Sequence, residues 1–455
     1  MSSVAVIGGG ITGLTAAFRL REKGHEVTLF EAGDRTGGVI QTTRDGEFLA
    51  ECGPNSILET SPKITQLVTD LGLDDRRLES NPDAENRFIL RGGKPVLMSS
   101  SPTGFFASPL FSMGAKFRLL IEPLIKASPA DAEESLADFV KRRLGQEFLD
   151  YAINPFVAGV YAGDPGRLSV KQAFPKLHAI EQKYGSLIMG QIRGARERKR
   201  TGEVSKQNAN KFSFDEGLQV LTDTLSESLG ESVRLKSPLT RLEKTSGENS
   251  VTTTVATERA KFDAVLLAMP AHKLAELEFD GGEPKLSALS EITYPPVASV
   301  VLGFRREDVA HALNGFGTLN PEVEGVNTLG TIFSSSLFTH RAPENHVTLT
   351  NYIGGMRSPE LARRSPEEII KLTVEDLRSI YGVTGDPVFS QCFVYPKAIP
   401  QYEVGYARFK DLMSQCERDN PGIFLAGHCR DGISLGDSIV SGHDVAQRIS
   451  DFLIA

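Results

Sequence analysis

Residues 3–32 read SVAVIGGGITGLTAAFRLREKGHEVTLFEA, and this stretch decides the fold. An apolar run leads into a cluster of glycines, a helical pattern of apolar residues follows, and a second apolar run closes the stretch. That order predicts a strand, a tight turn, a helix and a second strand, which together form a βαβ unit. We therefore expect an α/β fold built on a parallel sheet.

The glycines of this unit have the spacing of a dinucleotide-binding turn. Gly8, Gly10 and Gly13 fit the pattern GxGxxG. In that pattern the first glycine permits the turn, the second lets the backbone approach a pyrophosphate, and the third lets helix and strand pack closely. Glu31 closes the second strand, where a carboxylate accepts hydrogen bonds from a ribose 2′-hydroxyl. The acid argues against a 2′-phosphate, so the sequence predicts a dinucleotide without one.

Two further turns decide between a nicotinamide and a flavin dinucleotide. Residues 31–42, EAGDRTGGVIQT, place a second glycine pair straight after the acid, and residues 50–58, AECGPNSIL, add Gly53 and Pro54. A plain NAD domain does not require this second close-approach turn. The combination resembles the flavoprotein amine-oxidase superfamily, in which these turns run along the FAD pyrophosphate and up to the flavin. We therefore expect FAD.

The resemblance implies a set of FAD-contacting residues that is spread over the chain. Residues 263–271, DAVLLAMPA, resemble the returning strand of the FAD domain, and Val233 falls where the backbone meets the adenine. The predicted cofactor-binding residues are Gly8, Gly9, Gly10, Ile11, Thr12, Gly13, Glu31, Ala32, Gly38, Val39, Gly53, Pro54, Asn55, Ser56, Val233, Ile433, Ser434 and Leu435.

Residues 427–437, GHCRDGISLGD, combine glycines with His428, Cys429 and Asp431 near the end of the chain. A metal site would need further ligands at a recurring spacing. The sequence offers no evident ligands to accompany these three residues, so we expect no metal. The context of Cys429 is not that of amine oxidases with covalent flavin, so we expect FAD to be non-covalent. The loop opens a helix, and we expect the positive end of that helix to face N1 and the C2 carbonyl of the flavin.

Composition excludes several classes of protein. The chain has 455 residues, 40% of them hydrophobic and 24% charged, with a net charge of -8, which is typical of a globular protein without a nucleic-acid footprint. The cysteines show no CxxC spacing, which fits free thiols in a reducing compartment. The N-terminus has no basic n-region, and no run of 18 apolar residues occurs. We expect a cytoplasmic protein that does not span a membrane.

The remaining patterns predict a chain in three parts. Residues 233–268 and 290–395 alternate as strands do, whereas residues 100–205 have helical spacing that Pro123 and Pro155 interrupt. Residues 190–211 are basic and without apolar periodicity, which predicts a mobile surface segment. The expected parts are a Rossmann-like (GR2-type) FAD domain at 1–80, 206–285 and 400–455, an antiparallel-sheet substrate domain at 81–98 and 286–399, and a helical, membrane-associating domain at 99–205.

Four segments resemble the protoporphyrinogen oxidase family, and together they extend over most of the chain: 85–95, 154–177, 315–343 and 424–442. The resemblance assigns propionate binding to Arg87, which suits the bidentate bonds that a guanidinium forms with carboxylates. It also implies that Leu319, Ile332 and Tyr352 sandwich the macrocycle and that the Gly159 backbone faces the reacting ring. Tyr352 departs from the phenylalanine often found there and adds a hydroxyl that needs a partner.

The resemblance implies oxidation of a porphyrinogen to a porphyrin in three two-electron rounds, with dioxygen reoxidising the flavin and giving hydrogen peroxide. No acid–base residue is identifiable in the sequence. This absence agrees with a flavin reaction, because the cofactor carries the chemistry. The rivals are a coproporphyrinogen III oxidase, a flavin amine oxidase and a non-catalytic flavin- or porphyrin-binding protein. Suggested partners are the porphyrinogen, dioxygen, an anionic membrane surface that would make the protein peripheral on the cytoplasmic membrane, ferrochelatase or another pathway enzyme, and a second copy of the chain.

Overall fold

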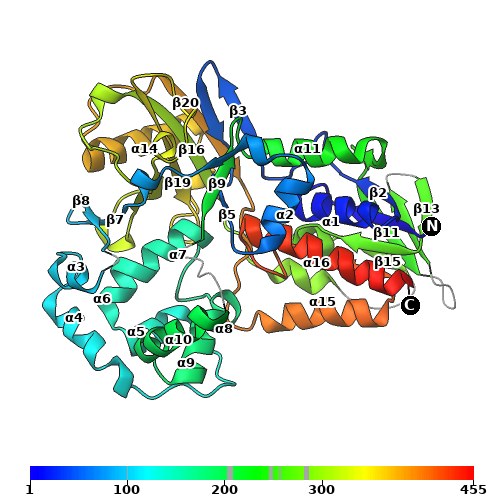
Figure 1. Cartoon of the computed structure of the whole chain (residues 1–455), viewed down its shortest axis with the longest axis horizontal. Coiled ribbons are helices and arrows are strands. Elements are labelled where there is room, and N and C mark those ends of the chain that lie inside the picture. Colours follow the sequence, from blue (N-terminus) through cyan, green and yellow to red (C-terminus); the bar gives the residue numbers. More distant parts are fainter. Residues whose placement is uncertain (100, 202–208, 245–249, 256–257, 281–285, 455) are drawn as a thin grey trace.

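The computed structural model describes residues 1–455 apart from 100, 202–208, 245–249, 256–257, 281–285 and 455. Figure 1 shows a lobe of sheets and helices that carries both termini, a second sheet lobe, and a lobe of helices on the side away from the termini. This arrangement confirms the predicted α/β fold class with sheet and helical parts.

The N-terminal stretch forms the centre of a five-stranded parallel sheet, as predicted. Its strand order is β10-β2-β1-β14-β21, and every neighbouring pair is parallel. The strands come from separated segments, so the sheet is non-contiguous in sequence: β1 (Ser3–Ile7), β2 (Glu26–Phe30), β10 (Val233–Arg234), β14 (Ala264–Leu267) and β21 (Ile423–Leu425). β1 and β14 are apolar along most of their length because both of their faces are covered.

Three helices cover one face of this sheet, and Figure 1 shows α1 and α16 side by side although they lie at opposite ends of the chain. They are α1 (Ile11–Glu22), α11 (Gln219–Leu229) and α16 (Leu435–Ile454). A Cβ on Gly442 would lie 2.5 Å from the backbone oxygen of Thr12, so the two helices approach too closely there for any side chain. The N-termini of α1 and α16 are thereby held next to each other.

Smaller sheets and helices complete the lobe that carries the termini. The strands β5, β9 and β6 form a three-stranded sheet that joins residues near 60 to residues near 211. The further elements are β3 (Thr42–Asp45), β4 (Phe48–Glu51), β5 (Ile57–Leu58), β6 (Arg77–Glu79), β9 (Lys211–Phe214), β11 (Leu239–Lys244), β12 (Val251–Val255), β13 (Glu258–Phe262), β15 (Glu278–Asp280), α2 (Pro62–Asp70), α12 (Ala271–Leu274) and α15 (Ala407–Asp419).

The second sheet has seven strands in the order β20-β16-β19-β18-β17-β7-β8. It is antiparallel, as expected, apart from the parallel pair of β17 and β7. Helix α14 (Pro366–Tyr381) packs on it, with Ser365 in a capping box and Gly382 as the left-handed C-cap. The strands are β7 (Arg87–Arg91), β8 (Lys94–Leu97), β16 (Val297–Arg305), β17 (Gly317–Leu319), β18 (Thr328–Ile332), β19 (His346–Gly354) and β20 (Phe389–Tyr395).

The helical lobe differs from the sequence prediction in two places. Pro155 does not interrupt a helix, because it lies in the first turn of α7, where no backbone N–H is needed. Residues 190–201 continue helix α10 and are not an irregular segment, while 202–208 lie outside the described residues. The helices are α3 (Pro102–Ala107), α4 (Met113–Leu120), α5 (Leu136–Arg143), α6 (Gln146–Phe148), α7 (Asn154–Tyr161), α8 (Val170–Ala173), α9 (Pro175–Tyr184) and α10 (Leu187–Thr201).

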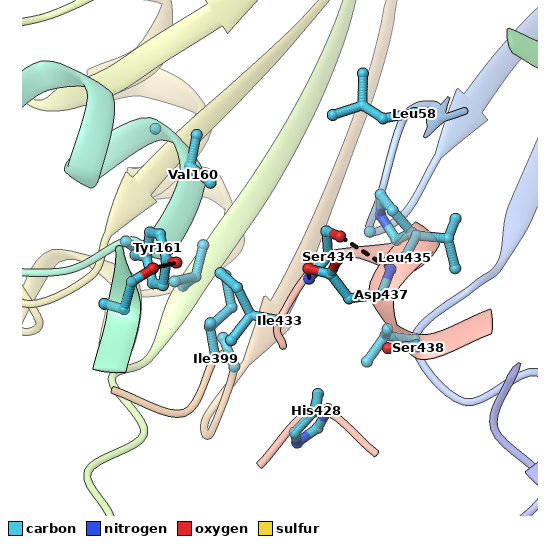
Figure 2. A pocket seen from close by; sticks show the side chains of 18 of the residues that line it. Leu58, Val160, Tyr161, Ile399, His428, Ile433, Ser434, Leu435, Asp437 and Ser438 are labelled. Atoms are coloured by element: carbon cyan, nitrogen blue, oxygen red, sulfur yellow. Dashed lines mark hydrogen bonds between the residues drawn. The ribbon is translucent and has the colours of Figure 1, made fainter. Parts of the chain in front are cut away.

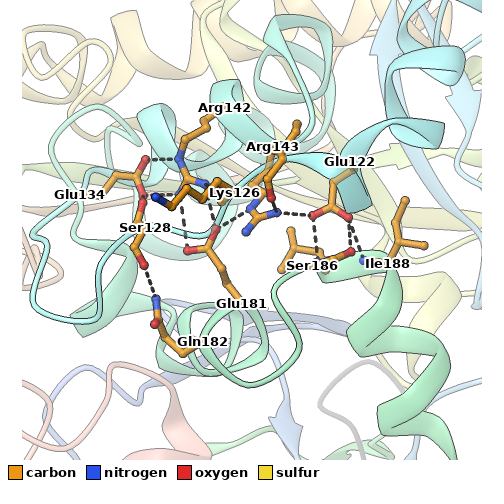
Figure 3. Close-up of polar contacts among 12 residues, drawn as sticks. Glu122, Lys126, Ser128, Glu134, Arg142, Arg143, Glu181, Gln182, Ser186 and Ile188 are labelled. Carbon is orange, nitrogen blue, oxygen red and sulfur yellow. Dashed lines mark hydrogen bonds and ion pairs between the residues drawn. The ribbon is translucent and has the colours of Figure 1, made fainter.

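A buried ion network joins four elements of this lobe (Figure 3). The side chains of Arg143, Glu122 and Glu181 are fully buried. Arg143 donates from Nη1 to Glu122 Oε1 at 3.1 Å and pairs with Glu181 through Nε. Glu122 in turn accepts a bond of 2.9 Å from the backbone N–H of Leu187 in the first turn of α10. The network therefore links α5, α9, α10 and the turn after α4.

Candidate active site

A cavity of about 2030 Å³ is lined by the parallel sheet, the seven-stranded sheet and helices α7 to α10. Pockets for a single drug-sized ligand are roughly 300–1,000 Å³. The cavity therefore has room for a dinucleotide and for a second large molecule beside it. One part of the cavity lies at the parallel sheet, and the other lies between the seven-stranded sheet and the helices.

The glycine turn after β1 has the geometry that its spacing predicts. Gly8 has a φ of +106°, which favours glycine, and a Cβ on Gly13 would lie 2.0 Å from the Gly8 carbonyl oxygen. Gly10 is different, since among the described residues no atom lies within 4 Å of where its Cβ would be. Gly10 lines the cavity, so its bare backbone is open to a ligand there.

Glu31 supports the same turn from the end of β2. Its carboxylate accepts bonds of 2.7 Å from the backbone N–H groups of Gly9 and Gly33, one on each oxygen. Each carboxylate oxygen can accept a second hydrogen bond. Because Glu31 also lines the cavity, it combines a structural role with spare acceptor capacity for ligand hydroxyls.

The terminal loop reaches the cavity at the N-terminus of α16 (Figure 2). Ser434 caps this helix, since its Oγ accepts a bond of 3.1 Å from the Asp437 N–H and its own N–H donates to Asp437 at 3.4 Å. Asp431 holds the preceding turn by accepting bonds from Ser441 Oγ at 2.6 Å and from the Gly427 N–H at 3.2 Å. No group of three or more His, Cys, Asp or Glu placed to hold a metal ion occurs in the described part of the chain.

His428 lies on the cavity wall below this helix end (Figure 2). Its Nε2 is 3.2 Å from the hydroxyl oxygen of Tyr294. Burial, with a smaller effect from His272, lowers the pKa of His428 from 6.5 to about 4, so the imidazole is neutral at pH 7. A neutral imidazole carries one donor and one acceptor, of which the Tyr294 hydroxyl uses one, and it adds no charge to the cavity wall.

This pKa predicts a stability loss in acid. Between pH 6.5 and 4 the unfolded chain takes up a proton at His428 that the folded protein does not, so stability falls as the pH falls, by about 3 kcal/mol in total. We expect His428→Gln to remove this part of the acid dependence in urea unfolding series. Equal acid dependence in the wild type and the variant would contradict the assignment.

The second part of the cavity is a narrow space between α7 and the seven-stranded sheet. A Cβ on Gly159 would lie 2.5 Å from Cδ2 of Leu319, so helix and strand come together there with no space for a larger residue. Ile332 and Tyr352 line the cavity from β18 and β19, next to β17 in the sheet. The three strands thus bring the predicted macrocycle-binding residues to one apolar face opposite Gly159.

The hydroxyl of Tyr352 has the partners that it needs. It donates to the Gly53 carbonyl oxygen at 3.2 Å and accepts from Asn55 Nδ2 at 2.6 Å. Burial raises the pKa of this phenol, which therefore stays protonated. Tyr352 consequently joins the sheet to the turn at residues 53–56, which lines the first part of the cavity.

Arg87 begins β7 beside Gly317 and lines the same space. Among the described residues it forms no ion pair with a carboxylate.

The structure places most of the predicted site residues on the cavity wall: Gly8, Gly10, Ile11, Thr12, Glu31, Ala32, Gly38, Val39, Gly53, Pro54, Asn55, Ser56, Arg87, Gly159, Leu319, Ile332, Tyr352, Ile433, Ser434 and Leu435. Gly9, Gly13 and Val233 are not among the lining residues. Gly9 and Gly13 shape the turn from behind, and Val233 pairs with Leu29 in the sheet.

The profile of the flavin-containing amine oxidoreductases matches residues 11–450. The chain belongs to this family. Protoporphyrinogen oxidase 2 of Arabidopsis thaliana is 37% identical to it, with 99% of this chain and 94% of the relative covered. Coproporphyrinogen III oxidase of Bacillus subtilis is 29% identical, with 96% of each chain covered. A solved structure from Exiguobacterium sp. 255-15, provisionally described as a protoporphyrinogen oxidase, has a TM-score of 0.82 and 26% identity over 100% of this chain and 99% of the other.

As a member of the flavin-containing amine oxidoreductases the chain is an oxidoreductase with FAD as its cofactor, and the cavity fits that group. The open backbone of Gly10, the spare acceptors of Glu31 and the N-termini of α1 and α16 offer contacts for a pyrophosphate, a ribose and a flavin. When bound, FAD supplies the two-electron oxidation, while the protein binds and orients the reactants.

The sequence interpretation left several cavity residues without a role. His428 was visible in the terminal loop but had no partner there, because Tyr294 comes from a distant segment. Phe174, between α8 and α9, and Leu177 and Ile180 of α9 line the cavity, and their three-residue spacing is a helical signal that could have shown them. Lys211 also lines the cavity, and a lone lysine in a strand gives no such signal.

Proposed function

We propose that the chain is an oxygen-dependent protoporphyrinogen oxidase that uses FAD to convert protoporphyrinogen IX to protoporphyrin IX in tetrapyrrole biosynthesis. The relatives named protoporphyrinogen oxidase from Arabidopsis and tobacco, at 37% and 35% identity over 99% of this chain, support the substrate. The observation that carries the proposal is the continuity of the cavity, which joins the glycine turn at Gly8 to the apolar space at Gly159 and to Arg87.

In this proposal the FAD extends along the first part of the cavity. Gly8 to Gly13 hold the pyrophosphate, Glu31 binds the adenosine ribose, and the Val233 backbone borders the adenine. Residues 53–56 and 433–435 border the flavin, with the N-terminus of α16 toward its pyrimidine side. A partial positive charge at a helix N-terminus stabilises nearby negative charge by about 0.3–2 kcal/mol, which favours the reduced cofactor.

The porphyrinogen would occupy the apolar space between α7 and the face that carries Ile332 and Tyr352. Its entry would turn the Leu319 side chain away from Gly159, since the two residues are in contact in this structure. Burial on both faces excludes water from the reacting ring, and Arg87 orients the ring through a propionate. No side chain of the chain is assigned as acid or base. Dioxygen would accept the electrons, giving hydrogen peroxide.

Arg87→Ala is expected to raise KM for protoporphyrinogen by about tenfold or more, because a hydrogen bond to a charged group contributes about 1.5–3 kcal/mol. The reaction itself occurs at the flavin, so kcat should change little. Steady-state fluorescence kinetics measure both constants. Arg305→Ala is the matched control, since Arg305 is exposed at the end of β16 in the same sheet and is not a lining residue. Unchanged KM in Arg87→Ala would remove Arg87 from the substrate site.

Coproporphyrinogen III is the second candidate substrate, because the cavity wall carries several cations that could bind its carboxylates. Besides Arg87, the lining residues include Lys176, Lys183, Lys211 and Lys273. Lys273 is paired with Glu276 at 2.7 Å. A substrate with four carboxylates would use more of these cations than one with two, so the ratio of kcat/KM for the two porphyrinogens distinguishes the candidates.

A direct test separates an oxidase from a carrier protein. Protoporphyrinogen added without oxygen should bleach the flavin absorbance of the purified protein, and air should restore it while porphyrin fluorescence rises. Binding of the porphyrinogen without bleaching would contradict the proposal and identify a non-catalytic porphyrin-binding protein.

We also propose that α4 and the turn after it lie against an anionic membrane surface. Met113, Phe117, Leu120 and Leu124 recur at helical spacing and are 56%, 60%, 59% and 86% exposed. Helix α10, whose sequence contains the basic run at 196–200, begins beside this face because Glu122 binds its first turn. No helix in the described ranges is long and apolar enough to cross a bilayer. An exposed apolar face of this kind matches a membrane interface, and a basic sequence in a helix of the same lobe favours an anionic one.

Replacing Phe117 and Leu124 together by serine should weaken binding to phosphatidylglycerol vesicles at least tenfold, because each buried side chain contributes roughly 1.5–3 kcal/mol. Vesicle co-sedimentation measures the loss, and Val388→Ser, 50% exposed in another lobe, is the control. Equal binding by both variants would contradict the membrane proposal. Sedimentation showing a dimer that the double variant abolishes would assign the face to a second copy, and capture of purified ferrochelatase would assign it to that enzyme.

A further inference from the structure

Two cations from different sheets line the wall of the same cavity. Arg87 is the first residue of β7 in the seven-stranded sheet, and Lys211 is the first residue of β9 in the sheet with β5 and β6. Their partners in register, Gly317 and Leu58, also line the cavity. The wall is therefore positively charged where the lobe that carries the termini adjoins the seven-stranded sheet.

The described part of the chain neutralises neither charge. Both side chains are half-buried, and among the described residues neither forms an ion pair with a carboxylate. Burial first and the charge of Arg87 second lower the pKa of the Lys211 ammonium group, and the exposed Glu85 opposes this only in part. Lys273, also on the wall, has Glu276 as its partner. Two like charges that are partly desolvated favour a ligand that brings negative charge to both.

We propose that Arg87 and Lys211 together form a two-cation subsite that binds two carboxylates of the substrate. This inference rests on the proposed function. In protoporphyrinogen IX the two propionates lie on neighbouring pyrroles at one edge of the ring, whereas the other edges are apolar. The planar guanidinium suits a bidentate contact with one carboxylate, and the compact ammonium binds the other as a point charge.

The subsite fixes how the ring lies in the cavity. With both propionates at Arg87 and Lys211, the apolar edges point toward Gly159, Leu319 and the aromatic and aliphatic residues of α8 and α9. Lys211 thus acts as a specificity-determining residue, because it distinguishes a ring with a pair of acidic groups at one edge from a neutral ring of the same size.

The experiment compares protoporphyrinogen IX with its dimethyl ester, which has the same ring and no free carboxylate. KM and kcat are measured for both compounds with the FAD-loaded wild type, Lys211→Met, Lys211→Arg and the control Lys371→Met, whose lysine is exposed on α14. We expect Lys211→Met to raise KM for the diacid about tenfold at nearly constant kcat. We expect no change in its KM for the ester, recovery in Lys211→Arg, and wild-type values in Lys371→Met.

Two results would overturn the subsite. One is an unchanged KM of Lys211→Met for the diacid. The other is an equal rise for diacid and ester, which would show that Lys211 acts on folding or on the flavin and not on carboxylates. In both cases the wild type remains active, so the proposed function would stand. A wild type that binds FAD but oxidises neither compound would refute the proposed function and the subsite together.

Discussion

Gly13→Ala is expected to yield protein without bound FAD. The added Cβ would lie 2.0 Å from the Gly8 carbonyl oxygen and 3.3 Å from Val6 Cγ1. The nearest atom belongs to the backbone, so relief requires α1 to move away from β1, and overpacking of this kind costs about 1–3 kcal/mol or more. That movement displaces the turn and the helix N-terminus that form the pyrophosphate contacts. The flavin absorbance of the purified protein relative to its protein absorbance measures the loss.

Two glycines nearby provide matched controls. Gly24→Ala places the methyl group at the end of the same helix, where φ is +86° but no described atom lies within 4 Å, so it should lower stability slightly and keep the flavin. Gly10→Ala has an ordinary φ of -71° and no clash, so the protein should fold, yet its methyl group would enter the cavity and weaken FAD binding. Full FAD occupancy in Gly13→Ala would contradict the proposed cofactor site.

Arg143→Met is expected to lower the free energy of unfolding by about 3–5 kcal/mol, because it leaves the buried carboxylates of Glu122 and Glu181 without their shared partner. Glu181 retains Arg142 at 2.9 Å, but Glu122 keeps only neutral donors within the described ranges, among them Ser186 and the first turn of α10. Since α9 and α10 line the cavity, the wall should loosen as well. Urea unfolding of the FAD-saturated protein measures the change.

Arg378→Met is the matched control for the ion network. Arg378 pairs with Asp386 at 2.7 Å on the surface, with side chains 47% and 89% exposed, and such pairs contribute about 0–1 kcal/mol. Arg143→Lys keeps the charge and should recover part of the loss. If Arg143→Met and Arg378→Met unfold at the same urea concentration, the network does not hold the helical lobe together.

The parts of the fold that depend on local sequence could be predicted well. The glycine turn, the strands on either side of it and the capped helix at 366–381 each follow from neighbouring residues, and the structure has all three. Pro155 was misread because proline is tolerated in the first turn of a helix, and the start of α7 has no cap that the sequence reveals. The helix at 190–201 was missed because its apolar residues are few.

The candidate site was only partly predictable, because most of its contacts join residues that are far apart in the sequence. The apolar face opposite Gly159 depends on the pairing of β17, β18 and β19, which no local pattern shows, so Leu319, Ile332 and Tyr352 came only from the resemblance to a known family. The partners of Tyr352 lie near residue 54, and that of His428 lies in another segment. Lys211 and Arg87 come to the same cavity because two different sheets border it.

The most direct test of the proposed function is a fluorescence assay of the purified, FAD-bound protein with protoporphyrinogen IX and coproporphyrinogen III in parallel, with dioxygen recorded. We predict rapid formation of protoporphyrin, a lower kcat/KM for coproporphyrinogen, and three molecules of dioxygen consumed per porphyrin, one for each two-electron round. A protein that binds FAD and oxidises neither porphyrinogen faster than the spontaneous reaction would contradict the proposed function.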